Sequence, residues 1–210
     1  MTALYQIEQS LISQGRFQEY YDLERRLGEM VGPDFQPHLP DCDAGFTQTT
    51  FHIYGVCARA AGHLKDAEEW FRKALRVEED GGRTASSQAA STLHSMGRCL
   101  QQDRRPEEAE GLFRRALEVK EARLGVDHVN VALTLYWLAM CVREAGKYGE
   151  AESLFRRALE IWEAKLGADH VDVALTLYWL AMCVREAGKY GEAEALLRRA
   201  LEIREAKLGV

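Results

Sequence analysis

Several features that would place this chain in other classes of protein are missing from its sequence. No apolar run approaches the roughly 20 residues that a membrane-spanning helix needs. The first fifteen residues, MTALYQIEQSLISQG, lack the basic-then-apolar order of a secretion signal. The chain has only four prolines, and three of them lie in residues 32–46, which we therefore expect to form a loop. We expect a soluble, cytoplasmic protein that does not bind membranes.

An excess of positive charge and the common catalytic motifs are missing as well. The formal net charge is −6, whereas a nucleic-acid partner requires a basic surface. The sequence contains no glycine-rich phosphate loop, no HExxH and no paired-cysteine motif. His52 and His94 have no serine or cysteine nucleophile beside them. We expect no enzyme activity, no catalytic residues, no cofactor, no metal site and no nucleic-acid partner.

Cysteine is sparse, and its spacing argues against disulfides. Cys57, Cys99, Cys141 and Cys183 recur every 42 residues, so each occupies the same position in successive repeats. Equivalent stacked helices lie at least about 8–10 Å apart, whereas a disulfide needs Cα atoms within about 7 Å. We interpret these four as small buried apolar residues of a protein from a reducing compartment. Cys42 lies between two aspartates that could ligate a metal, but an exposed loop is the favoured interpretation.

The strongest positive signal is an internal repeat. Residues 126–167 and 168–209 differ at five positions, which are Val126/Ala168, Asn130/Asp172, Ser153/Ala195, Phe155/Leu197 and Trp162/Arg204. Self-similarity at a fixed period of this size indicates an array of stacked repeats.

Each repeat reads as two amphipathic helices around a glycine turn at Gly146. In the first helix the apolar face is Leu135, Leu138, Ala139 and Val142. In the second helix it is Ala151, Leu154, Phe155, Ala158 and Leu159. Small residues in these stripes let two helices approach closely while large ones fill the space beside them. A single hairpin cannot bury its own apolar face, so it must stack on its neighbours.

The order Leu138-Ala139, Gly146, Tyr148, Ala151, Phe155 and Ala158 resembles the tetratricopeptide repeat. The common form of that repeat has a period of about 34 residues, and a 42-residue period is more similar to the kinesin-light-chain subtype. That subtype also occurs in arrays attached to NB-ARC signalling ATPases. The resemblance implies an all-α fold, a right-handed superhelical α-solenoid of about five antiparallel helix hairpins.

We predict one solenoid domain over residues 1–210. Its repeats are expected at about 1–31, 47–80, 86–125, 128–167 and 170–209, with the loop at 32–46. Gly15, Gly62, Arg104, Gly146 and Gly188 align at the turns inside the hairpins. Asp127 and Asp169, just before first helices, are expected to act as helix caps. The neighbouring His128 and His170 are expected to be structural loop residues rather than metal ligands.

In the tetratricopeptide family the first helix of each hairpin lines a concave groove. The residues that this resemblance places on the groove are His52, Arg59, His94, Arg98, Tyr136, Trp137, Met140, Arg143, Tyr178, Trp179, Met182 and Arg185. Two interpretations of Trp137 and Trp179 stay open: packing between adjacent first helices, or exposure as aromatic anchors. Tyr136, Tyr178, Arg143 and Arg185 are the favoured contacts. The Arg-Arg pairs at 114–115, 156–157 and 198–199 are interpreted as solvated faces.

The predicted function is a protein–protein interaction scaffold that binds a peptide or partner segment in this groove. Repeat domains that grip acidic chaperone tails use lysine and asparagines where this chain has His, Tyr, Trp and Met, so that clamp is absent. A self-assembly or structural module is the alternative, because Leu196, Leu197, Leu201 and Ile203 have no expected partner in the chain. We therefore also expect the chain to be part of a longer array. A sensor region of a larger NB-ARC-type protein is a third possibility.

Overall fold

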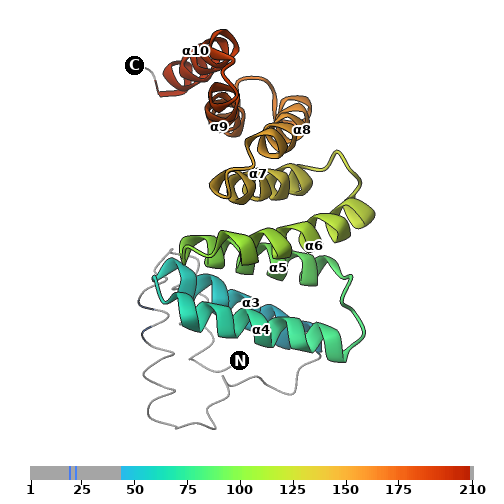
Figure 1. Ribbon diagram of the computed structural model, residues 1–210. Helices are drawn as coiled ribbons and strands as arrows, with labels where there is room; N and C mark the ends of the chain where they lie inside the picture. Colours follow the sequence, from blue (N-terminus) through green and yellow to red (C-terminus); the bar gives the residue numbers. More distant parts are fainter. Residues whose placement is uncertain (1–18, 20–21, 23–43, 209–210) are drawn as a thin grey trace. The chain divides into compact units, whose positions relative to one another are not determined.

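The computed structural model describes residues 19, 22 and 44–208. Most of the predicted first repeat, 1–31, and most of the predicted loop lie outside the described residues. The described helices are α3 (Ala44–Ala60), α4 (Leu64–Asp80), α5 (Ser87–Gln102), α6 (Pro106–Leu124), α7 (Val129–Glu144), α8 (Tyr148–Leu166), α9 (Val171–Glu186) and α10 (Tyr190–Leu208) (Figure 1). No strand occurs in 44–208, so the predicted all-α class is confirmed there.

The helix α3 begins at Ala44, and the predicted loop is therefore wrong in its last three residues. Residues 44–208 fall into two compact units. Unit one ends at Asp103 and contains α3, α4 and α5, whereas unit two begins at Arg104 and contains α6 to α10. The single domain over residues 1–210 stays a prediction.

Within each unit, every helix packs against the next one in the chain. In unit one α3 packs on α4 and α4 on α5, and in unit two the same holds for each step from α6 to α10. The predicted apolar face of α7 is buried, with Leu135, Leu138, Ala139 and Val142 at most 1% exposed. Leu135 belongs to a core cluster that α8, α9 and α10 also enter. Burying the face of one hairpin thus requires side chains from the following hairpin.

A small residue on the first helix lets the second helix approach closely. In unit one, a Cβ atom added to Gly55 would lie 2.5 Å from Cε1 of Phe71, which is closer than such atoms can approach. The equivalent residues are Gly97, Ala139 and Ala181. Phe71 has no exposed surface. The predicted pairing of small and large side chains is therefore confirmed in the α3–α4 hairpin.

The turns inside the hairpins require a left-handed backbone conformation. Gly62, Gly146 and Gly188 have φ angles of 84°, 76° and 76°. Arg104 occupies the equivalent position with φ of 63°, the one positive φ of a non-glycine residue in the part of the chain described. An L-residue in this region costs roughly 1–2 kcal/mol relative to its ordinary conformations. Of these four turns, the one between α5 and α6 is consequently the one with a strained backbone.

Histidines, and not the predicted aspartates, cap the first helices of the two near-identical repeats. Nδ1 of His128 accepts a hydrogen bond from the backbone N–H of Asn130 at 3.1 Å. Nδ1 of His170 accepts one from the N–H of Asp172 at 3.2 Å. The prediction for Asp127 and Asp169 was wrong because each lies one residue before the N-cap. The two histidines have the structural role expected of them.

The four periodic cysteines are buried and free of disulfides, as predicted. Burial raises the pKa of the Cys57 and Cys141 thiols to about 12 and that of Cys183 to about 11. The thiol of Cys99 donates to the carbonyl of Leu64 at 3.3 Å. Thiols this difficult to ionise are poor nucleophiles at neutral pH.

One lysine of unit two, Lys120, is buried and forms no ion pair with the described residues. Lys120 is 7% exposed, and its Nζ donates to Oγ1 of Thr134 at 2.8 Å. Oγ1 of Thr134 in turn donates to the carbonyl of Asn130. Burial lowers the pKa of Lys120 from its ordinary 10.5 to about 8. The next repeat places Trp162, which is also buried, at the equivalent position.

The strained turn gives a reciprocal test. Replacing Arg104 by glycine should raise the free energy of unfolding by about 1 kcal/mol, because glycine adopts a positive φ without a steric penalty. Gly146→Arg should lower it by a similar amount, since a Cβ at Gly146 meets nothing within 4 Å and only the backbone is strained. Urea denaturation followed by circular dichroism measures both. Equal stability of Arg104→Gly and the parent would contradict the assignment of strain.

The buried lysine predicts a pH dependence. Between pH 8 and 10.5 the unfolded chain binds more protons at Lys120 than the folded chain, so the contribution of Lys120 to stability should rise with pH in that window. The buried thiols contribute in the opposite direction above about pH 9, so the rise is read as the difference between the parent and a variant without Lys120. Lys120→Met should remove this rise and, by avoiding a buried charge, stabilise the fold at pH 7 by about 1–3 kcal/mol. Denaturation midpoints from pH 7 to 10.5 test it. Lys165→Met, at an exposed position on α8, serves as the control and should leave the pH profile unchanged.

Candidate protein-interaction surface

The first helices of unit one hold His52 in a polar network. Nδ1 of His52 lies 3.0 Å from Oγ1 of Thr92, and the Gln48 side-chain amide donates to the same oxygen at 3.0 Å. The Thr92 hydroxyl itself donates to the carbonyl of Gln88. We therefore assign Nδ1 of His52 as a donor, and burial lowers the pKa of the ring. His52 is anchored rather than free to reach a partner.

A shallow depression opens beside this network. It has a volume of about 220 Å³. Its lining consists of polar side chains from α3 and α5, which are Gln48, Thr49, His52, Ser87, Gln88 and Ser91. The lining carries no full charge when His52 is neutral, so it can offer hydrogen bonds but no ion pair.

Two arginines of unit one lie close enough to influence each other. Burial and the positive charge of Arg59 both lower the pKa of Arg98, burial being the larger cause. Nε of Arg59 is buried and has no hydrogen-bond partner in the described part of the chain. Two neighbouring guanidinium groups of this kind favour an anion between or beside them.

In unit two, α7 and α9 are joined by an aromatic cluster. The ring of Tyr136 packs edge-on against Trp137 and Phe155, with centroids 5.4 and 5.8 Å apart. The indole N–H of Trp179 donates to the Tyr136 hydroxyl, and burial raises the pKa of that phenol. The guanidinium carbon of Arg143 lies 4.4 Å from the centroid of the Trp179 ring. Trp179 therefore lies between two side chains of the preceding first helix.

The predicted groove residues differ in how much of each residue is exposed to solvent. His94 and Met140 are only 7% and 8% exposed, so little of either side chain can reach a partner in this conformation. Packing between successive first helices accounts for the half-buried Trp179 better than full exposure does. Tyr178 is 43% exposed, and Arg185 is exposed with an ion pair to Glu186 at 2.9 Å.

The remaining predicted groove residues are intermediate in exposure. They are His52, Arg59, Arg98, Tyr136, Trp137, Arg143 and Met182. Each offers part of its side chain to solvent, and their role in binding stays a prediction.

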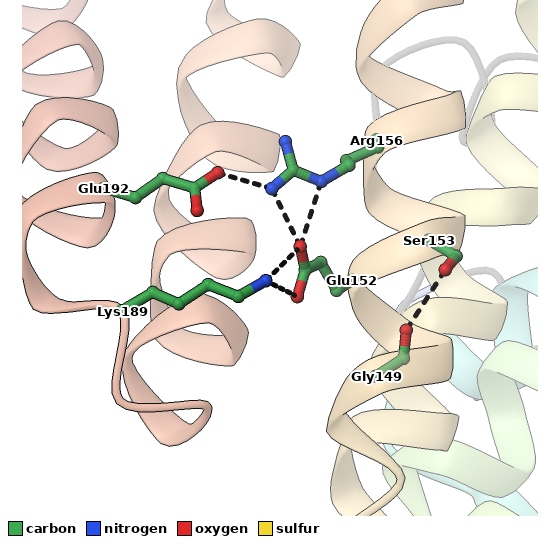
Figure 2. A network of polar contacts seen from close by, with 6 residues as sticks. All are labelled: Gly149, Glu152, Ser153, Arg156, Lys189 and Glu192. Carbon is green, nitrogen blue, oxygen red and sulfur yellow. Dashed lines mark hydrogen bonds and ion pairs between the residues drawn. The ribbon is translucent and has the colours of Figure 1, made fainter.

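A network of ion pairs between second helices was missed by the sequence analysis. Arg156 on α8 donates to Glu152 at 2.8 Å and to Glu192 on α10 at 2.5 Å (Figure 2). Lys189, just before α10, reaches back to Glu152 at 3.4 Å. The hydrogen bond from Arg156 is the main cause that lowers the pKa of Glu152. The same three contacts occur one repeat earlier, among the four residues Glu110, Arg114, Lys147 and Glu150.

The second arginine of two of the predicted Arg-Arg pairs also links neighbouring repeats. Arg157 lies 2.6 Å from Glu121 on α6, and Arg199 lies 2.6 Å from Glu163 on α8. The side chains of Arg157 and Arg199 are also 39% and 41% exposed, so these ion pairs lie on a solvated face. The 42-residue spacing of the charges was the signal that could have revealed these contacts. Partly exposed ion pairs contribute little stability each, but their pattern specifies how one hairpin stacks on the next.

Residues 19, 22 and 44–208 also bear on two other kinds of site. They contain no group of three or more His, Cys, Asp or Glu side chains placed to hold a metal ion. None of the helices described is long and apolar enough to cross a membrane.

Comparison with known proteins identifies the class. The tetratricopeptide repeat family matches residues 88–161 and 130–206, which together cover more than half of the chain. The chain therefore belongs to the tetratricopeptide repeat family. No curated protein gives a significant match.

Solved structures show the same fold. BtubC (BKLC) from P. vanneervenii is similar with a TM-score of 0.80 and 22% identity, over 99% of this chain and 80% of that chain. A Podosopora anserina protein assigned as a kinesin light chain, with nearly identical TPR-like repeats, has a TM-score of 0.72 and 18% identity, over 98% and 95%. The apo form of RapI has a TM-score of 0.74 and 16% identity, over 95% and 52%.

These similarities confirm the α-solenoid class, and kinesin-light-chain-like proteins are among the relatives in structure. The tetratricopeptide fold is typically a non-catalytic scaffold, and its members generally bind other proteins. A role in protein–protein interaction is therefore the general function that the fold suggests.

Proposed function

We propose that the first-helix surface binds an acidic, aromatic segment of a partner protein. The observation that carries the proposal is the guanidinium of Arg143 stacked on Trp179 in unit two. Nε of Arg143 is buried without a hydrogen-bond partner in the described chain, and Arg143 forms no ion pair there. An arginine held in place without a carboxylate is prepared to receive one from outside.

The surroundings of Arg143 fix its orientation. Trp179 is held by its hydrogen bond to Tyr136 and by edge contact with Tyr178, whose ring centroid lies 5.0 Å away. A guanidinium fixed on an aromatic ring loses little side-chain freedom when it binds a carboxylate in a bidentate manner. Part of the entropic cost of binding is thereby met before the partner arrives.

Unit one offers a second cationic position on its first helices. Burial and the nearby charge of Arg59 lower the pKa of Arg98, and an acidic side chain placed beside the two guanidinium groups would relieve that repulsion. The local charge on these helices thus favours acidic partners although the chain as a whole is negative. The exposed Tyr178 supplies an amphipathic ring of the kind common in binding hot spots.

Self-association is the second candidate, favoured by the exposed apolar surface of α10, where Leu201 is 56% exposed.

Two finer assignments rest on the 42-residue period. They are membership of the kinesin-light-chain-like subtype and a sensor role in a larger NB-ARC-type protein. The sequence of the full-length gene tests the sensor role by showing whether a nucleotide-binding motif precedes the array. Buried free thiols go with a cytoplasmic location.

The near-identical repeats supply a matched test of the proposal. Arg143→Ala should weaken binding of fluorescent acidic-aromatic peptides about tenfold or more, because a charge-assisted hydrogen bond is lost. Arg185→Ala should have a much smaller effect, since Arg185 is paired with Glu186 and has no tryptophan beneath it among the described residues. Fluorescence anisotropy titrations measure the dissociation constants.

A Tyr178→Ala variant removes the exposed ring that packs edge-on against Trp179, and it should also weaken binding. Unchanged affinity of Arg143→Ala and Tyr178→Ala for every peptide that the parent binds would remove the proposal. Circular dichroism of each variant checks that the helices remain folded.

A further inference from the structure

The acidic-peptide proposal leaves the depression between α3 and α5 without a role. Its volume of about 220 Å³ is smaller than the pockets of about 300–1,000 Å³ that hold drug-sized ligands. The depression is open on one side and lies on the first helices of unit one, where the proposed function places a partner segment. It is therefore of a size and in a place to receive one side chain of such a segment.

The polar lining of the depression is a local feature of unit one. The equivalents of its six lining residues in unit two, two 42-residue repeats later, are Ala132, Leu133, Tyr136, Val171, Asp172 and Leu175. Four of these are aliphatic, and the hydroxyl of Tyr136 is already bonded to Trp179. Unit two forms the same stack of hairpins with these residues. Stacking alone therefore does not require polar side chains at these positions, and their presence in unit one needs another reason.

His52 supplies an open hydrogen-bond acceptor to the depression. Its Nδ1 donates to Oγ1 of Thr92, so Nε2 carries the lone pair of the neutral ring. Burial lowers the pKa of His52, which favours the neutral ring at neutral pH. Nε2 has no partner among the described residues. A ligand in the depression can therefore donate a hydrogen bond to this nitrogen.

Three exposed side chains from the start of α5 supply the other polar groups. The hydroxyl of Ser91 donates to the carbonyl of Ser87 at 2.9 Å, so its oxygen is left as a second acceptor. The Ser87 hydroxyl and the Gln88 side-chain amide have no partner among the described residues, and both can donate. The depression thus offers two acceptors, on His52 and Ser91, beside two donors.

This set of groups disfavours most side chains as occupants. An ionised carboxylate has only acceptors, so it would face the lone pairs of His52 and Ser91. An ammonium or guanidinium group has only donors, and none of the six lining residues is acidic. A hydroxyl has one donor for two acceptors. An aliphatic side chain would displace water from all four groups and replace none of its hydrogen bonds.

A primary carboxamide has the matching set, because it carries two N–H donors and one oxygen with two lone pairs. We infer that the depression binds the side-chain carboxamide of a glutamine or asparagine in a partner segment. His52 and Ser91 accept its two N–H groups, and Ser87 and Gln88 donate to its oxygen. The inference rests on the proposed function for the presence of a partner segment on the first helices, but it does not involve Arg143.

Nuclear magnetic resonance titration of the isotope-labelled 210-residue chain tests the site with small probes. N-acetylglutamine N-methylamide and its asparagine analogue should shift the Nε2 resonance of His52 and the backbone amides of Ser87 and Gln88. A dissociation constant of about 1 mM is expected for the better of the two, because a ligand of this size makes few contacts. The glutamate and leucine analogues, which share the probe backbone, should bind at least tenfold more weakly.

Two variants remove one acceptor each. His52→Asn keeps an N–H group near Thr92 but lacks Nε2, and Ser91→Ala lacks the second acceptor. Each should weaken binding of the carboxamide probe about fivefold or more, as read from the amides of Ser87 and Gln88, because one N–H of the probe is left unpaired. The matched control is Ser95→Ala, the same substitution one turn further along α5 and outside the lining, which should bind the probe as the parent does.

Three results would overturn the inference. They are the absence of shifts at the lining residues with the carboxamide probes at tens of millimolar, equal or tighter binding of the glutamate analogue, and unchanged binding by both variants. Arg143→Ala should leave the titration unchanged. Retained binding of the carboxamide probe together with no binding of acidic-aromatic peptides would refute the proposed function but not this site, and the opposite result would refute this site alone.

Discussion

The contact on which the rest of the structure depends is a small residue of one helix pressed against an aromatic ring of the next. In unit one Gly55 meets Phe71 with no room for a Cβ atom. Because this contact sets how closely two helices of a hairpin approach, it also determines which side chains face the following hairpin. In unit two, Trp179 lies beside Arg143, and Lys189 lies beside Glu152. Both contacts join one hairpin to the next.

Much of the fold could be predicted from the sequence, because it is encoded by local patterns. Apolar spacing predicted the helices, and Gly146 predicted the turn between them. The φ angle of Gly146 is 76°, which matches that role. The caps were missed because a one-residue difference separates Asp127 from His128, and spacing alone cannot resolve it. The residue Arg104 was aligned with turn glycines, but only the backbone angles show that it adopts their conformation.

The surface was less predictable, because exposure depends on the neighbouring repeat and not on the local sequence. Tyr136 and Tyr178 lie in identical sequence segments, yet Tyr136 is half-buried and Tyr178 is exposed. His94 and Met140 were assigned to the surface by their positions on first helices, although both are buried. Ion pairs such as Arg156 with Glu192 join residues 36 positions apart, so they require the spacing of two hairpins to be known.

The recurrence of one polar network every 42 residues has a consequence for how the gene can change. Duplication or deletion of a whole 42-residue segment recreates the contact between Glu152 and Lys189 at the new junction, with no residue substituted. A gain or loss of any other length would bring mismatched helices together and leave carboxylates facing carboxylates. Recombination between such similar segments can therefore lengthen or shorten the array in whole steps while each junction stays intact.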